Sequence, residues 1–337
     1  MHNADILAAA PDALAAALGV PRRNPHPMAD DLKFDTLSKL AYAYGLAVRP
    51  QQTSEPDRAV QARGMSSAEF GRALAGAADT LAVRRFDDVA THRIFCGIVE
   101  ARDFKPVPTS IADSGLDLPS VGELGEITHG VVNVTNSGTA QLSSYARVLS
   151  FSRESVINDE TDLIGRTIAN QGAAGARTEA KLVYELMEAN PALDDGELVF
   201  QADHGNLVAA ALDGTNLATA MAALRNQQTA AGNRADLPAR HLVVEPALEY
   251  PALKLAHEAG LPLTVTASSR LPSGRWFLMA DPSLSPNISV LRLRGAANSV
   301  RVDEVPPRIG FDGLRLRVVA RLAAVFQSRI GIVRGGA

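Results

Sequence analysis

The chain has 337 residues, of which 46% are hydrophobic and 21% charged, a composition typical of a globular protein with one large or two modest domains. Its formal net charge of −4 and sequence pI of about 6.0 provide no overall attraction for nucleic acid, so we do not expect strong affinity for DNA. The single cysteine, Cys96, excludes an intramolecular disulfide and a thiolate metal cluster.

The sequence gives no indication of membrane insertion or export. No segment approaches the ~18 uninterrupted apolar residues that a membrane span requires, so we expect no membrane partner. Residues 1–20 are rich in Ala and Leu, but Asp5, Pro11 and Asp12 interrupt them and no basic flank precedes them, which is unlike a secretory signal. We expect the chain to stay in the cytoplasm until it is assembled into a larger structure.

The first 80 residues predict helices joined by polar breaks. An Ala-rich helix is expected over 6–18 and a second over 32–44, separated by the breaker PRRNPHP at 21–27. A linker-like stretch at 51–58 precedes a third short helix predicted over 66–81. This pattern indicates an arm or connector more than a compact domain.

From Val121 the pattern changes to that of two long strands. The stretch Val131–Thr135, a turn at Asn136–Gly138 and the stretch Leu142–Phe151 predict a hairpin around a tight reversal. Many Ser, Thr and Asn residues occupy both faces, and an isolated two-stranded ribbon is marginally stable in water. We therefore expect the hairpin to be stabilised by a partner, most simply another copy of the chain.

A long helix is predicted to follow the hairpin. Asn158 and Asp159 suit a helix start, and Asn190-Pro191 ends the pattern, which gives about 30 residues and a length of about 45 Å. Such a length indicates a spine for the domain. Apolar or small residues, with one Gln, recur mostly three or four positions apart at Leu163, Ile164, Ile168, Gln171, Gly175, Thr178, Leu182 and Leu186.

The rest of the chain predicts a module of alternating strands and helices and then a return to strands. Strands are expected at 198–200, 241–244 and 276–279, with helices at 217–227 and 247–258, in an α/β or α+β module of about 100 residues. From Ile288 strands return, and in residues 314–322 apolar and Arg residues alternate. Such a strand has one buried face and one face lined with guanidinium groups.

A search for catalytic or cofactor motifs finds little. There is no nucleophile elbow, P-loop, dinucleotide fingerprint or zinc-protease helix. Asp194-Asp195-Gly196 together with Asp203–Asn206 could supply oxygen and imidazole ligands to a metal, but the same residues are what two turns need. His92 and His129 have no other candidate catalytic or metal-binding residue beside them in the sequence. We expect no catalytic residue, no metal and no cofactor. Several arginines of the tail could contact nucleic-acid phosphates or the carboxylates of a neighbouring subunit, and the sequence leaves both open: Arg292, Arg294, Arg301, Arg315, Arg317 and Arg321.

The order of these parts resembles the Hong Kong 97-type major capsid fold, in particular the major head subunits of Mu-like phages that are often fused behind a prohead protease. Short motifs recur in the family's order over roughly residues 80–337. They are Asp103–Pro106 (DFKP), Gly122–Glu126 (GELGE), Phe151–Asp159 (FSRESVIND), Ala189–Pro191 with Asp195-Gly196, Leu198–Phe200 and His204–Leu207 (HGNL), Arg275–Pro282 (RWFLMADP), and the closing Gly335–Ala337. By this resemblance the Asp-Gly and His-Gly-Asn-Leu elements are structural turns.

The resemblance implies an α+β fold with a defined domain order. Residues 1–80 form a helical arm or connector, 81–120 an N-arm leading into the shell fold, and 121–157 the E-loop hairpin. Residues 158–191 form the spine helix of the peripheral domain, 192–287 mainly the axial domain, and 288–337 the returning strands of both domains. The residues implied in assembly, at the hairpin and its junction, are Glu123, Glu126, Asn136, Gly138, Arg147, Arg153, Asn158 and Asp159.

The function implied is self-assembly through hexamers and pentamers into an icosahedral head that encloses double-stranded DNA, with the chain located in the virion. Its partners would be itself, a portal, and scaffolding, protease or decoration proteins, with packaged DNA touched only non-specifically. Two alternatives stay open. One is an encapsulin-like compartment shell with an enzyme cargo, and the other, from a different class, is a hydrolase that uses Asp203 and His204.

The lysine positions generate a first prediction. The founding member of this fold family links its subunits through an amide between a hairpin lysine and an asparagine of a neighbour, which requires an uncharged amine as nucleophile. The five lysines are Lys33, Lys39, Lys105, Lys181 and Lys254, and none lies between Val121 and Ile157. Arginine cannot substitute, because its guanidinium stays protonated. Mature particles boiled in denaturing detergent should run as one band near 35.6 kDa, or slightly below it if the arm is trimmed. A ladder of covalent pentamers and hexamers would contradict this argument.

Overall fold

The computed structural model describes residues 68–113, 133–152, 154–155, 161–229, 232–296, 298–306 and 313–336, together with seven isolated positions between 9 and 29. The helices predicted over 6–18 and 32–44 lie outside the described residues, apart from four helical positions between 9 and 16. The chain divides into two compact units. Unit 1 comprises residues 1–90, 144–177 and 296–321, and unit 2 comprises residues 91–143, 178–295 and 322–337.

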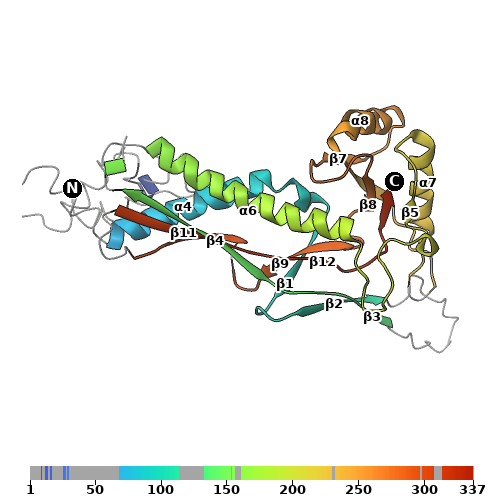
Figure 1. The fold of residues 1–337 in the computed structure, drawn as a ribbon, viewed down its shortest axis with the longest axis horizontal. Helices are drawn as coiled ribbons and strands as arrows, with labels where there is room; N and C mark the ends of the chain where they lie inside the picture. Colours follow the sequence, from blue (N-terminus) through green and yellow to red (C-terminus); the bar gives the residue numbers. More distant parts are fainter. Residues whose placement is uncertain are drawn as a thin grey trace, which may run out of the picture. The chain divides into compact units, whose positions relative to one another are not determined.

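Unit 1 combines helices with a three-stranded sheet. Helix α4 (Ala68–Val89) and the first half of α6 (Thr161–Ala189) belong to it, and the sheet has the order β10 (Val300–Glu304), β11 (Gly313–Leu322), β4 (Ser143–Ser152) (Figure 1). Burial alternates strictly along β11, as the sequence predicted. The third helix, predicted over 66–81, extends to Val89, because the apolar spacing continues through Ala82 and the buried Phe86.

Small residues let α4 and α6 approach closely. A side chain at Gly172 would place its Cβ 2.2 Å from the backbone oxygen of Ala82, and one at Gly175 would meet Val300 at 2.8 Å. The backbone N–H of Val302 donates to the Asp79 carboxylate at 2.8 Å, which joins α4 to β10. The buried positions Ile164 and Ile168 agree with the predicted stripe, whereas Leu163 is 55% exposed. The buried face of the helix continues through Gly172 and Ala176, each one residue after the predicted positions Gln171 and Gly175. The shift occurs because the contact with α4 requires the smallest side chains.

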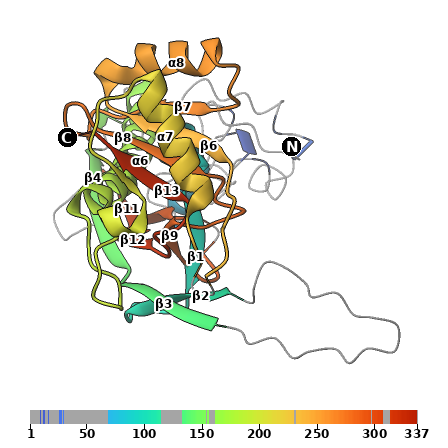
Figure 2. The same ribbon diagram turned by 90° about the vertical axis from the view of Figure 1, so that its right-hand side faces the viewer.

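Unit 2 contains two sheets and a ribbon. Strand β1 (Gly97–Ala101) pairs in parallel with β9 (Ile288–Leu293), which pairs on its other side with β12 (Ala324–Phe326). A five-stranded sheet has the order β5 (Leu207–Val208), β13 (Ile332–Gly335), β8 (Trp276–Ala280), β6 (Ala239–Val244), β7 (Thr264–Ala267). Helices α7 (Gly214–Asn226) and α8 (Glu249–Glu258) accompany this sheet (Figure 2). The ribbon is formed by β2 (Val107–Asp113) and β3 (Asn133–Ala140).

Short 3-10 helices and turns connect these elements. The 3-10 helices are η1 (Thr91–Ile94), η2 (Ala202–His204) and η3 (Pro246–Leu248). The strand predicted at 198–200 is not formed, and Leu198 makes only an isolated bridge with Ala192. Helix α6 ends at Ala189, as the Asn-Pro pair predicted. Asn190 adopts φ 46°, and its side chain donates to the Phe200 carbonyl and accepts from the Phe200 N–H. No helix among the described residues is long and apolar enough to cross a membrane.

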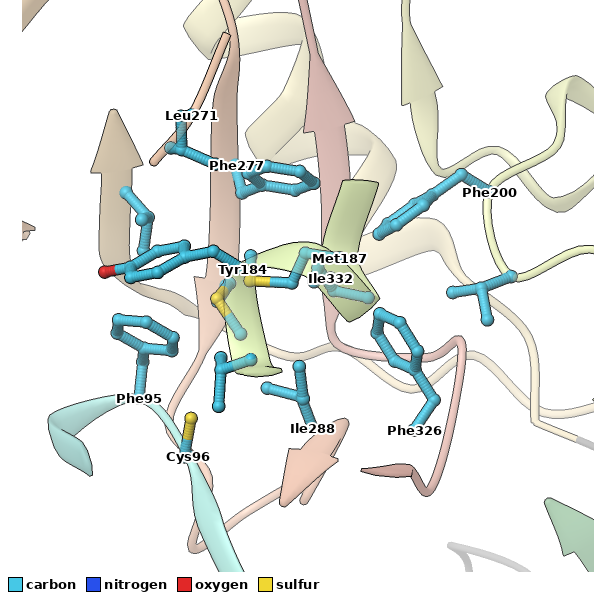
Figure 3. Packing of buried hydrophobic residues seen from close by; sticks show 14 of the residues in the cluster. Phe95, Cys96, Tyr184, Met187, Phe200, Leu271, Phe277, Ile288, Phe326 and Ile332 are labelled. Carbon is cyan, nitrogen blue, oxygen red and sulfur yellow. The ribbon is translucent and has the colours of Figure 1, made fainter. Parts of the chain in front are cut away.

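Two apolar cores flank the central strand β8. All five of its residues are buried, and successive side chains point to opposite faces of the sheet. Trp276 and Leu278 pack with residues of α7 and α8, and Phe277 and Met279 pack with the second half of α6 and with β9 and β12. In this second core the Phe200 ring lies 5.6 Å from Phe277 and meets Phe326 edge-on at 5.9 Å (Figure 3). Tyr184 and Met187 of α6 fill the space between these rings and Phe95.

The close approach of β13 to β8 generates a second prediction. A Cβ at Gly335 would lie 1.9 Å from Cε2 of the fully buried Trp276, whose indole N–H donates to the Ala210 carbonyl. Gly335→Ala should therefore lower the stability by about 1–3 kcal/mol or more, because a packed core cannot admit the methyl group. The measurement is the thermal unfolding midpoint.

Gly214→Ala is the matched control. Gly214 is the first residue of α7, and its added Cβ would find its nearest neighbour at 3.9 Å. This variant should unfold at or slightly above the parent's midpoint, because Ala favours helix. Equal midpoints for the Gly335 and Gly214 variants would refute the packing argument.

Candidate functional site

The ribbon β2–β3 corresponds to the predicted hairpin, and its position differs from the prediction. Residues 107–113 pair antiparallel with 133–140, with Val107 opposite Ala140 and Asp113 opposite Asn133. The predicted pairing of 131–135 with 142–151 is wrong, because β4 lies in the sheet beside β11. The turn predicted at Asn136–Gly138 is also wrong, because β3 runs through these residues.

The Asn-Ser-Gly sequence marks a β-bulge instead of a turn. The register steps from Pro108 opposite Thr139 to Ser110 opposite Asn136, so that two residues of β3 face Thr109 alone. The Thr109 hydroxyl donates to the Gly138 carbonyl at 2.7 Å across this irregularity. Both turns and bulges favour Gly and Asn, which is why the sequence did not separate them.

Gly138 is needed for a close backbone contact at the base of the ribbon. A Cβ at this position would lie 2.8 Å from the backbone oxygen of Phe326 and 3.1 Å from Val325. Glycine in a strand commonly marks a site where another backbone approaches. Gly138 therefore helps attach the ribbon to β12, a role that the sequence did not reveal.

An apolar cluster holds the base of the ribbon. Leu142, just after β3, is buried with Ala101, Leu291 and Val325, and Val107 and Ala140 at the ends of the ribbon strands pack against this group. The Gln141 side chain donates to the Phe104 carbonyl at 2.8 Å and ties the connection after β3 to the loop before β2. The ribbon is thus fastened to the rest of unit 2 at its base.

The other predicted assembly residues are distributed as follows. Asn136 lies in β3 opposite Ser110, and Arg147 is exposed on β4, which is a strand of unit 1 and not of the ribbon. The prediction placed Arg147 in the hairpin, and the structure shows that it lies elsewhere. Glu123, Glu126, Arg153, Asn158 and Asp159 lie outside the described residues.

The Asp-Gly and His-Gly-Asn-Leu segments form turns, as the resemblance implied. Gly196 has φ 82°, and Gly205 has φ 62° where it ends η2, both in the left-handed region that glycine tolerates. The Asn206 side chain is buried, donates to the Val199 carbonyl at 2.6 Å and accepts from Gln201 N–H at 3.0 Å. Its backbone oxygen accepts from Arg334 N–H, which links the turn to β13.

An arginine that the sequence search missed occupies the centre of the suspected metal cluster. Arg329 pairs with Asp195, donates to Glu197 at 3.0 Å and contacts the His204 ring at 2.9 Å. His204 and Arg329 hold the pKa of Glu197 below its ordinary value. Burial raises the pKa of Asp195, but hydrogen bonds and Arg329 outweigh it and leave that pKa lowered. Among the described residues no three His, Cys, Asp or Glu side chains gather as a metal site would require.

A buried carboxylate on α6 binds the segment that follows α4. Glu179 is 1% exposed, and Arg93 of η1 donates to both of its oxygens at 3.1 and 2.8 Å. His92 Nε2 lies 3.5 Å away. Burial alone would raise the pKa of Glu179, but the nearby His92 and the hydrogen bonds from Arg93 outweigh it and lower that pKa. The periodicity of the helix predicted an apolar face here and could not reveal an ion pair across 86 residues.

A second carboxylate of α6 binds the end of the chain. Glu188 pairs with Arg275 at 3.2 Å and with Arg334 at 3.5 Å. The buried Arg275 also donates to the Gly336 carbonyl at 2.8 Å. These pairs join α6 to the start of β8 and to β13.

A protein-family model described as phage capsid protein matches residues 136–335. No curated protein matches this chain.

Solved structures with the same fold include shell proteins. A virus-like particle from Pyrococcus furiosus is 11% identical, with 76% of this chain and 96% of that chain covered and a TM-score of 0.50. A phage-related protein from Bordetella bronchiseptica RB50 is 12% identical, with 76% and 96% covered and a TM-score of 0.51. An encapsulin complex from Synechococcus elongatus PCC 7942 is 8% identical, with 73% and 86% covered and a TM-score of 0.50. These similarities concern the fold.

The buried Glu179 pair generates a third prediction. Glu179→Gln keeps the shape but leaves Arg93 without its carboxylate, and at neutral pH it should lower the free energy of unfolding by about 3 kcal/mol. Because the folded-state pKa lies below the ordinary 4.5, the carboxylate's contribution is present above that value and is lost as the pH falls through the folded-state pKa. The stability gap between parent and variant should therefore narrow on acidification, measured by thermal unfolding over a pH series.

Glu185→Gln on the same helix is the control. Glu185 is 63% exposed and pairs with Lys181, so its loss should cost less than about 1 kcal/mol. If the difference in stability between the parent and the Glu179→Gln variant did not change with pH, the role assigned to the Glu179 charge would be ruled out.

Proposed function

Since this chain belongs to the phage capsid protein family, we propose that it assembles through hexamers and pentamers into an icosahedral phage head that encloses double-stranded DNA. The family model matches more than half of the chain, and the α+β fold is of the Hong Kong 97-like type. The observation that carries the proposal beyond family membership is the ribbon β2–β3, which is attached to the rest of unit 2 at its base.

The ribbon's composition supports a role between subunits. Residues 107–140 are rich in Ser, Thr, Asn and Gly, and a two-stranded ribbon of this kind buries too little apolar surface to be stable alone. A neighbouring copy would supply the missing contacts. The proposed assembly residues are those of the hairpin and its junction, and Gly138 acts by holding the ribbon's base against β12.

The remaining parts take roles consistent with a shell. We propose that unit 1, with α4 and its three-stranded sheet, acts as the peripheral domain, and that the five-stranded sheet with α7 and α8 acts as the axial domain. A portal and scaffolding, protease or decoration proteins are the proposed partners in addition to the chain itself. Packaged DNA would be touched only non-specifically, because the net charge is −4. Assembly would occur in the host cytoplasm and the product would be the virion shell.

We propose that the chain has no enzymatic activity. The hydrolase alternative needs His204 as a general base close to Asp203, but Arg329 and Glu197 contact the His204 ring instead. The Asp-His pair is thus better explained by turn formation and surface ion pairing.

An encapsulin-like compartment is the second candidate, because an encapsulin has the same fold at a TM-score of 0.50. The molecules enclosed in purified particles distinguish a phage head from a compartment. A phage head would contain double-stranded DNA, and a compartment would contain a cargo protein and no genome. Negative-stain microscopy followed by nuclease-protected DNA measurement makes this distinction.

The hairpin generates a fourth prediction. Replacing residues 111–135 by an Asn-Gly turn joins Ser110 to Asn136, which already face each other, and leaves β4 in its sheet. The variant should fold but yield no closed shells by microscopy, because it lacks the hairpin surface that contacts the neighbouring subunit. Circular dichroism and thermal unfolding serve as the controls for folding. Closed shells formed as readily as by the parent would mean that the hairpin has no assembly role.

A further inference from the structure

The outer edge of strand β10 faces helix α4. Among the described strands β10 pairs only with β11, and Val305 N–H donates to the Arg315 carbonyl at one end of that ladder. Residues at alternate positions of an antiparallel edge strand direct their N–H groups away from the partner strand. Val302 N–H therefore points to the free edge, where the Asp79 carboxylate of α4 accepts it at 2.8 Å. The helix thus satisfies a donor that the sheet itself does not use.

A second carboxylate of β10 faces the same helix. Glu304 lies two positions after the buried Val302, so its side chain points to the same side of the sheet. Its carboxylate lies against the α4 backbone, because a Cβ built at Gly71 would overlap the Glu304 oxygens. Burial raises the pKa of Glu304 above its ordinary value of 4.5, although the nearby Arg72 acts in the opposite direction. The contact therefore favours the uncharged acid.

Asp79 is also disfavoured as an anion. Burial raises its pKa above the ordinary 3.8, and the Val302 N–H and Arg301 act in the opposite direction with less effect. Arg301 donates to Asp303 at 2.6 Å, and the charge of Asp303 itself raises the pKa of Asp79. In contrast, Glu179 of α6 is held in an ion pair and has a lowered pKa. The contact between α4 and β10 therefore responds to pH in the direction opposite to the Glu179 pair.

We propose that Asp79 and Glu304 form a proton-sensitive latch, which holds α4 on the edge of β10 while both are protonated and loosens when they are ionised. In the folded chain both pKa values are raised, so ionisation costs stability at neutral pH. That cost disappears as the pH falls through the folded-state values toward 3.8 and 4.5. Loosening of α4 uncovers the outward N–H groups of β10, and an uncovered edge strand is a template for pairing with another chain. The latch therefore makes access to this edge depend on pH.

Hydrogen exchange of the full-length chain, followed by mass spectrometry of α4 peptides, measures how often this helix opens. Exchange is compared at neutral pH and at pH 4.5, the ordinary value of a glutamate, after correction for the intrinsic effect of pH on amide exchange. Protection of the α4 amides should increase severalfold at the lower pH, because each unit of pKa shift changes the opening equilibrium up to about tenfold. Helix α7, which packs on the five-stranded sheet, should show no such increase.

Neutral replacements mimic the protonated latch. Asp79→Asn with Glu304→Gln keeps an oxygen that can accept the Val302 N–H. At neutral pH this variant should give the α4 protection that the parent reaches at pH 4.5, and acidification should change it no further. The control is Asp88→Asn, which removes a carboxylate from the exposed surface of α4, where it lies 4.0 Å from Arg85. The control should keep the pH dependence of the parent.

Several results would overturn the latch. One is a parent chain whose α4 protection falls or stays constant on acidification, and another is an equal rise in α7, which would show a general effect of pH. A third is a pH dependence that persists unchanged in the Asn–Gln variant, because other groups would then be responsible. If that variant does not fold, Glu304→Gln alone should still lose part of the pH dependence, and its full retention would overturn the proposal.

Discussion

Burial of strand β8 on both faces is the constraint from which unit 2 is built. Its five residues alternate between two cores, so helices α7 and α8 must cover one side while α6, β9 and β12 cover the other. Strand β13 comes from the end of the chain and must lie beside β8, and it can do so only because Gly335 leaves room for the Trp276 indole.

Ion pairs then fix the orientation of α6 within unit 2. Its carboxylates at Glu179 and Glu188 are held by arginines that come from η1, from the residue before β8 and from β13. Buried ion pairs add little net stability compared with apolar packing, but a mispaired arrangement leaves a buried charge without a partner, which is strongly unfavourable. Their value here is to select one arrangement of helix and sheets. A shell requires this, because each subunit must present its contact surfaces in a reproducible geometry.

The sequence predicted those features that depend on local chemistry. The strict alternation of β11, the end of α6 at Asn190 and the turns at Gly196 and Gly205 each follow from a few neighbouring residues. Features that depend on distant partners were missed. The bulge at Gly138 depends on the approach of β12, and the clusters around Arg329 and Glu179 join residues more than 80 positions apart. Similarly, the buried face of α6 is shifted by one residue because its contact with Ala82 of α4 favours glycine over larger apolar residues.

The composition of the hairpin also limits the contacts that it can make. An exposed two-stranded ribbon has free edges, and free edges tend to pair with one another and to aggregate. Four carboxylates with no compensating Lys or Arg make two hairpins repel, and Pro108 and Pro119 remove backbone donors from the same segment. The segment also lacks the lysine amine that an amide cross-link would need, and Lys105 lies two residues before β2. The composition of this segment therefore disfavours contacts between two copies of the hairpin, and discrimination of this kind comes from repulsion at wrong partners as well as from attraction at the right one.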